Sequence, residues 1–89
     1  MQAASASARL RFVNLSPGEP PLDVYLDEAL IVATLGYAQP SEYLESAAGR
    51  HGVRCYPAGT SGWENLVLDA DLEKLRPRFD YTLALVNRL

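Results

Sequence analysis

Residues 9–27 read RLRFVNLSPGEPPLDVYLD and hold the pattern that decides the fold. The first part alternates, with Leu10, Phe12 and Asn14 on one face, as is typical of a half-buried β-strand. The three prolines of the SPGEPP segment lack the amide hydrogens that a strand ladder needs, so the chain must turn there. Residues 22–27 then alternate again. The stretch predicts two β-strands joined by a rigid bend.

Other parts of the chain repeat the alternation. Strands are expected at three further places: 50–56, 64–72 and 80–89. Residues 30–35 (LIVATL) are rich in β-branched side chains, which favours a strand, although Gly36 could equally end a helix. Residues 71–76 (DLEKLR) could form one short helical turn. We therefore expect an all-β fold, a small antiparallel sandwich of about seven strands or a barrel.

The segment 40–49 (PSEYLESAAG) carries conflicting signals. Pro40 near its start, Glu42 in the first turn and Gly49 at its end are typical of a short helix. Taken alone, this local pattern leaves helix and strand open.

Size and composition limit what the chain can be. Its 89 residues are enough for one domain, expected over 9–89, with residues 1–8 (MQAASASA) read as a disordered leader. The net charge of −3, with acids and bases scattered, is a poor basis for nucleic-acid binding. The longest apolar run, 29–38, is too short to span a membrane, and the N-terminus lacks the layout of a signal peptide. A single cysteine, Cys55, excludes an internal disulfide and a cysteine metal cage.

The order of these segments resembles a known family. RLRFVNLSPGEPPLDVYLDE, YLESAAGRHGVRCYPAGTSG and YTLALVNRL follow one another as in the bacterial domain-of-unknown-function family numbered 4397. That family has a HASPDAP-like bend, a VDVY strand, a PAG loop and a YTVA strand. The resemblance covers about residues 9–86.

The resemblance implies an immunoglobulin-like β-sandwich, usually a module of secreted or cell-envelope proteins, with no assigned activity. It implies a secreted or envelope location here, while a cytoplasmic one stays open because the chain shows no signal peptide. It also implies that residues 41–44 form a strand rather than a helix, and we expect that outcome because tertiary context overrides weak propensity.

The chain departs from the family pattern at three places. Asn14 stands where the family usually has His, which removes a titratable group from the bend. Glu28 stands where the family usually has Gly, which argues against a two-residue hairpin turn with positive φ. Residues 75–79 (LRPRF) replace a compact turn and lengthen the last connection.

Candidate catalytic groups are few. His51 and Cys55 share one strand face, but neither has a sequence partner that would complete a catalytic or metal-binding set, so both are read as core or rim residues. Carboxylates are plentiful, yet no spacing selects a glycosidase pair or a calcium loop. We expect no catalytic site, no metal and no cofactor.

Two aromatic residues are candidates for binding. Tyr25 points away from the apolar face of its strand, and Trp63 follows a Thr-Ser-Gly loop, so together they could form an exposed aromatic platform. The alternative is that Trp63 covers one end of the core and Tyr25 lies under a loop. In the bend, we expect Asn14, Ser16, Pro17 and Asp23 to be structural, the polar three through hydrogen bonds across it.

These observations predict a non-enzymatic β-sandwich module that binds a protein or glycan ligand at a surface. One alternative is a structural spacer, or a domain that associates with copies of itself through residues 30–35 if these form an edge strand. A remote alternative is a small hydrolase that uses His51 and a carboxylate.

Overall fold

The computed structural model describes residues 7–18 and 20–86. Within these residues the chain forms seven β-strands and one 3-10 turn, η1 (Trp63–Asn65). The strands are β1 (Ser7–Asn14), β2 (Leu22–Leu26), β3 (Ala29–Leu35), β4 (Leu44–Ala47), β5 (Gly49–Pro57), β6 (Leu68–Leu75) and β7 (Asp80–Leu85).

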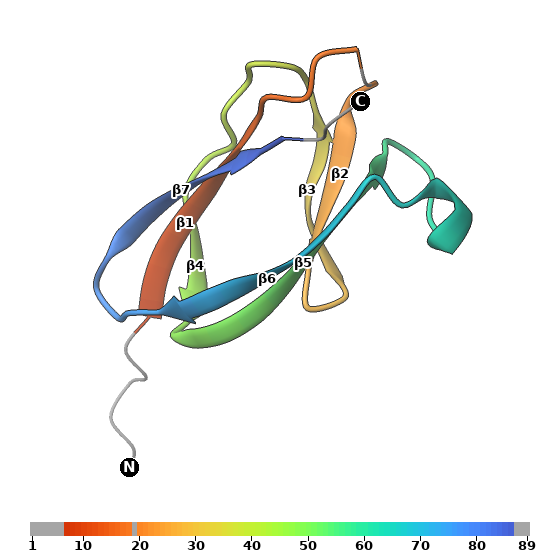
Figure 1. The fold of residues 1–89 in the computed structure, drawn as a ribbon. Coiled ribbons are helices and arrows are strands. Elements are labelled where there is room, and N and C mark those ends of the chain that lie inside the picture. The colour runs from red at the N-terminus through yellow and green to blue at the C-terminus, as the bar shows by residue number, and fades with distance from the viewer. Residues whose placement is uncertain (1–6, 19, 87–89) are drawn as a thin grey trace.

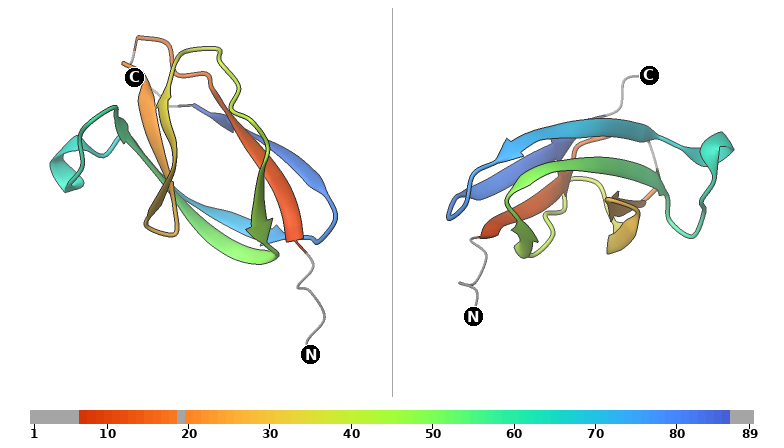
Figure 2. Two further views of the ribbon diagram at one scale, coloured as in Figure 1. Left: turned by 180° about the vertical axis from the view of Figure 1, so that it is seen from behind. Right: turned by 90° about the horizontal axis from the view of Figure 1, so that it is seen from below.

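The strands lie in two sheets (Figure 1). One sheet has the order β4-β1-β7, and the other has the order β3-β2-β5-β6. The connection between β5 and β6, which contains η1, projects beyond the ends of these strands in every view (Figure 2). The all-β class and the sandwich of seven strands are confirmed.

One strand pair is not antiparallel as expected. β7 runs parallel to β1, with Arg9 opposite Asp80 and Asn14 opposite Leu85. The reason lies in the connection after β6, which passes the start of β1: the amide of Arg78 donates to the carbonyl of Ser7 over 2.8 Å. Because β7 therefore begins beside the beginning of β1, the two strands run in the same direction.

The core lies between the sheets, as the alternation predicts. Its fully buried side chains come from both layers: Ala8, Leu10 and Phe12 from β1, Leu22 and Val24 from β2, and Cys55 from β5. At about 25 cal/mol for each Å² of apolar surface removed from water, these contacts are the main stabilising contribution to a small domain.

Three boundary predictions are wrong. Residues 71–76 do not form a helical turn, because Asp71 and Leu72 pair with β5 as part of β6. The strand expected over 64–72 begins only at Leu68, since η1 occupies its start. The leader expected over 1–8 ends too late, because Ser7 and the buried Ala8 belong to β1, while residues 1–6 lie outside the described residues.

The segment 40–49 contains a strand, but later than expected. β4 covers Leu44–Ala47, and Leu44 lies opposite Leu10 of β1. Ser41 precedes β4 and bonds to β1 twice: its hydroxyl oxygen accepts from the Phe12 amide at 2.9 Å, and its own amide donates to the Phe12 carbonyl at 2.7 Å. Pairing with β1 therefore outweighs the local helix signals.

The bend after β1 is held by buried polar side chains. The Asn14 side-chain amide donates to the carbonyl of Leu35 at 2.9 Å, and its oxygen accepts from the amide of Ser16 at 2.9 Å. The Ser16 hydroxyl donates to the carbonyl of Leu85 at 2.9 Å. These bonds connect the end of β1 to β3 of the opposite sheet and to β7 of its own sheet.

Asp23 serves a different junction from the one expected. Although alternation along residues 22–27 predicts an outward side chain at this position, Asp23 is buried. Its two oxygens accept from the amide of Thr34 and the amide of Gly59, each at 2.9 Å. It therefore fixes the irregular end of β3 and the loop after β5, not the bend beside Asn14 and Ser16. Thr34 has φ 58, a conformation costly for a β-branched residue. The hydrogen bond that its amide donates to Asp23 offsets part of that cost.

The β2–β3 hairpin has the two-residue turn that Glu28 argued against. Asp27 and Glu28 both have positive φ, 50 and 73, as a type I′ turn requires. Asp27 supplies the fixed point, because its amide donates to the carbonyl of Gly52 at 2.9 Å and its Oδ1 accepts from the amide of Gly52 at 2.8 Å. The turn therefore forms in spite of Glu28 and carries strain there.

We expect Glu28→Gly to stabilise the protein. Glycine removes a left-handed strain of about 1–2 kcal/mol, whereas its greater unfolded-state entropy costs about 0.5–1 kcal/mol, which leaves a net gain of up to about 1.5 kcal/mol. Urea unfolding measures the difference. Glu42→Gly is the matched control, because Glu42 is exposed without positive φ and should only lose stability. Equal losses in both variants would contradict the strain at Glu28.

Candidate functional site

The exposed tryptophan lies against an arginine of β5. Trp63 is 68% exposed on η1, and the Arg54 guanidinium carbon lies 4.8 Å from its ring centroid. The Arg54 side chain also pairs with Asp69 of β6, with 3.5 Å between Nε and Oδ1. Arg54 therefore holds Trp63 beside the outer face of the four-stranded sheet.

Tyr25 belongs to the same outer face. It lies opposite Arg54 across the β2–β5 ladder, and its ring meets the ring of Tyr56 edge to face, with 5.4 Å between centroids. Cross-strand aromatic contacts of this kind fix ring orientation. Tyr25 and Trp63 thus each contact a residue of β5 rather than form one stacked platform. We call the surface formed by Tyr25, Arg54, Tyr56, Trp63 and Asp69 the aromatic face.

A shallow hollow continues the aromatic face toward the β2–β3 turn. It measures about 180 Å³, and Gly52 is part of its lining. A Cβ at Gly52 would meet only the Asp71 carboxylate, at 4.0 Å, so the glycine leaves space there. Its lining is Tyr25, Asp27, Glu28, Gly52, Arg54, Asp69 and Asp71. A second hollow of about 470 Å³, beside His51, shares Asp27, Gly52 and Asp71. The surface therefore offers flat rings, carboxylate acceptors and a guanidinium donor within one concave region.

The position of Trp63 depends on Asp23. The carboxylate accepts the amide of Gly59 in the Pro57-Ala58-Gly59 loop, which leads to η1. Gly59 has φ 81, so this turn requires a residue that tolerates the left-handed conformation. A buried side chain of β2 thereby orients the loop that carries the exposed aromatic ring.

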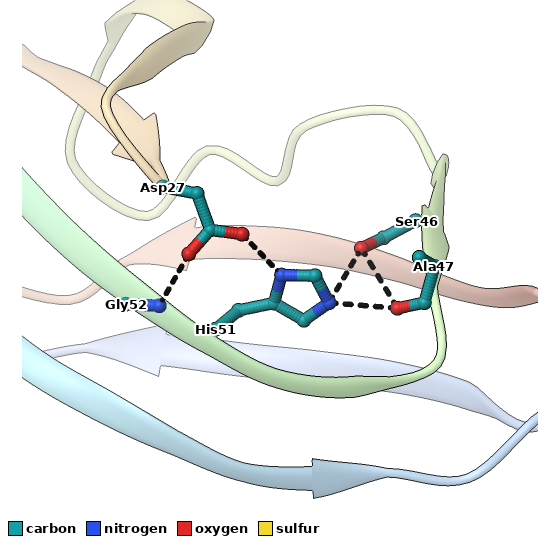
Figure 3. Close-up of polar contacts among 5 residues, drawn as sticks. All are labelled: Asp27, Ser46, Ala47, His51 and Gly52. Atoms are coloured by element: carbon teal, nitrogen blue, oxygen red, sulfur yellow. Dashed lines mark hydrogen bonds and ion pairs between the residues drawn. The ribbon is translucent and has the colours of Figure 1, made fainter.

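A cluster of polar contacts lies at the corner between the sheets, and its member Asp27 also lines the hollow (Figure 3). His51 of β5 contacts Asp27 through Nδ1, and through Nε2 it contacts the carbonyl of Ala47 at 2.7 Å and the hydroxyl of Ser46 at 3.2 Å. Ser46 and Ala47 belong to β4, so this His51 cluster joins the two sheets. We name it by its members: Asp27, Ser46, Ala47 and His51.

The cluster has the residue types of a serine hydrolase triad but not its proton arrangement. A backbone carbonyl only accepts hydrogen bonds, so Nε2 must carry a proton toward Ala47. The ionised Asp27 carboxylate likewise requires a proton on Nδ1. Both ring nitrogens are then donors, and the imidazolium has no lone pair with which to take a proton from Ser46.

Electrostatics agrees with a charged imidazole. The hydrogen bond from Asp27 raises the pKa of His51 against the opposing effect of burial, and the Ala47 carbonyl adds to the rise. The Gly52 amide and then His51 lower the pKa of Asp27. Arg50, Asp71 and Glu73 are charged residues that line the hollow beside them.

Cys55 is a core residue, as expected. It is fully buried between the sheets, and burial raises the pKa of its thiol to about 12. The thiolate needed for nucleophilic attack is therefore scarce at neutral pH. Although Cys55 and His51 share a strand face, the hydrogen-bond partners of His51 are Asp27, Ser46 and Ala47.

Sequence reasoning found two members of the aromatic face and missed three. Tyr25 and Trp63 were selected from the sequence, whereas Arg54, Tyr56 and Asp69 were not. The signal was present, because Gly52, Arg54 and Tyr56 alternate with the inward Val53 and Cys55 along β5. Within the described residues, no three of the His, Cys, Asp and Glu side chains are grouped so as to hold a metal ion, and no helix there is long and apolar enough to cross a membrane.

The fold and the aromatic face define a small two-sheet β-sandwich module. Residues 8–89 match the model of a domain of unknown function, DUF4397, and the chain belongs to that family. No curated protein and no solved structure matches the chain.

We expect the His51 cluster to stabilise the fold most in mildly acidic solution. A raised pKa makes the His51 contribution complete below about pH 6.5 and lost as pH rises through the folded-state value, whereas the lowered pKa of Asp27 makes its contribution complete above about pH 4. His51→Gln should therefore cost about 1 kcal/mol near pH 5 and less near pH 8.5, a modest value because half of the Asp27 side chain is exposed. Urea unfolding of both proteins at the two pH values measures the effect.

The matched control is Asp27→Asn in both backgrounds. The coupling free energy of the double-mutant cycle should be present near pH 5 and should decline at alkaline pH. A coupling that is independent of pH would contradict the protonated imidazole.

We also expect Ser46 not to react as a catalytic serine. A fluorophosphonate probe needs a serine activated by a neutral base, and the imidazole here already donates through both nitrogens. Intact-mass spectrometry should show no adduct in the wild-type protein at neutral pH. An adduct that disappears in Ser46→Ala would instead establish the hydrolase reading.

Proposed function

We propose that this chain is a non-enzymatic binding module and that its ligand is a glycan held on the aromatic face and the adjoining Gly52 hollow. The observation that carries the proposal is the exposed Trp63, held by Arg54 beside a concave surface with both acceptors and a donor. A large aromatic side chain that is 68% exposed on a small domain is a frequent anchor of binding surfaces.

The chemistry of the surface favours a saccharide over a peptide that is only acidic or only basic, because the surface carries both carboxylates and a guanidinium. Flat rings suit the apolar faces of sugar rings, whereas Asp69 and Asp71 accept hydrogen bonds from hydroxyl groups and Arg54 donates them. The hollow is small and open, so we expect contact with one or two sugar units and weak affinity at a single site.

A non-enzymatic role is supported by the surroundings of the two candidate nucleophiles, neither of which is activated. Ser46 faces an imidazole that donates through both nitrogens, and Cys55 is buried with a raised pKa. We further propose a secreted or cell-envelope location, where glycan ligands are abundant, and this rests on the family resemblance.

A glycan array probed with the labelled chain tests the proposal first. Since Trp63 is the single tryptophan, its fluorescence then gives a direct titration of each hit. Trp63→Ala should weaken binding at least about tenfold, equal to about 1.4 kcal/mol, measured by calorimetry or ligand-observed NMR. Gly52→Val, which fills the hollow, should weaken binding while the protein stays folded.

The matched control is Tyr37→Ala. Tyr37 is another exposed aromatic residue, but it lies in the connection between β3 and β4, next to β1 of the other sheet. It should bind as the wild type does. An array without hits would favour the structural alternative, a spacer, and hits that are insensitive to Trp63→Ala would place the ligand elsewhere.

A further inference from the structure

β3 is an outer strand of the four-stranded sheet and differs from the other outer strands in charge. Its sequence, ALIVATL, has no charged residue and no proline. The other outer strands of the described residues all carry charge: Glu45 in β4, Asp80 in β7, and Asp69, Asp71, Glu73 and Lys74 in β6.

Outer strands present backbone groups that can pair with another strand. Proteins usually protect them with charge, proline or a covering segment. The side chain of Leu30 is 49% exposed on β3, and Ile31 and Val32 are only partly buried. Burying these side chains against another strand would be favourable, and β3 itself carries no charge that opposes it.

We propose that two copies of this chain pair through antiparallel β3 strands, which joins their sheets into one continuous sheet of twice four strands. A second copy fits this edge because a two-fold axis places an uncharged strand against itself, whereas the same operation on β6 would bring acidic side chains together. The pairing segment lies within Ala29–Ala33, where the ladder to β2 shifts register between Val32 and Leu30, and it ends before Thr34, whose φ of 58 leaves the extended conformation.

The pairing has a geometric consequence for the outer face. The two-fold axis of an antiparallel pair is perpendicular to the sheet, so both copies keep the same side outward. Leu30 lies opposite Tyr25 in the β2–β3 ladder, which places the new edge beside the aromatic face. The dimer would present two aromatic faces on one surface, and a repeating ligand could engage both.

The inference does not depend on the proposed function, and its test uses no ligand. Sedimentation equilibrium of the whole chain, from low to high micromolar concentration, should show a mass that rises from monomer to dimer. Leu30→Lys combined with Ala33→Lys should stay monomeric, because both residues are exposed and lysine on an outer strand opposes pairing with another strand.

The matched control adds the same charge elsewhere. Leu15→Lys combined with Val86→Lys changes two exposed apolar residues away from β3 and should dimerise like the wild type. Thermal unfolding checks that both variants fold. Hydrogen exchange should slow at residues 29–33 of the wild type as concentration rises.

Three results would overturn the proposal. They are a wild-type protein that remains monomeric throughout, a β3 lysine variant that dimerises as well as the wild type, and a control variant that loses dimerisation equally.

Discussion

The arrangement of the strand ends depends on one buried amide side chain, that of Asn14 at the end of β1. Asn14 reaches the carbonyl of Leu35 in the opposite sheet and accepts the amide of Ser16, whose hydroxyl reaches Leu85. A buried polar group without partners would cost about 1–3 kcal/mol, so these residues tolerate only the arrangement that satisfies all of them. Within the described residues, every buried side-chain nitrogen and oxygen has a partner. The proline-rich bend that follows can be short, because hydrogen bonds already fix Ser16 at its start.

The same principle operates again at Asp23 and at His51. Asp23 accepts one amide from β3 and one from the loop that leads to η1, and His51 connects β4 to the β2–β3 turn. A domain of this size buries a modest apolar core, so polar side chains at its corners contribute much of the definition of its loops. They also act on the aromatic face, because Asp23 fixes the loop that leads to Trp63 and His51 contacts Asp27, which lines the hollow.

Alternation of side chains predicted most of this fold. The inward residues of β1, the strand at 50–56 and the first part of the final strand followed directly from period two, because each has one face against the core. The final strand, expected over 80–89, ends at Leu85, and residues 87–89 lie outside the described residues. The failures have a common physical origin. Residues 71–76 and 40–49 carry helix signals, yet each forms strand by pairing with a distant partner, β5 or β1. The candidate site was half predicted for the same reason: Tyr25 and Trp63 are notable alone, whereas Arg54 becomes notable only once η1 returns beside β5.

The parallel pair of β1 and β7 has a mechanical meaning. Because the two strands run in the same direction side by side, β1 begins at one end of the sandwich and β7 finishes at the other. A pull along the chain through these strands would draw them in opposite directions along their length. The six register positions from Arg9–Asp80 to Asn14–Leu85 would then carry the load together, in shear, rather than open one after another. Separating six positions at once takes more force than separating them one at a time, so this pair is the stiffest path for tension along the chain.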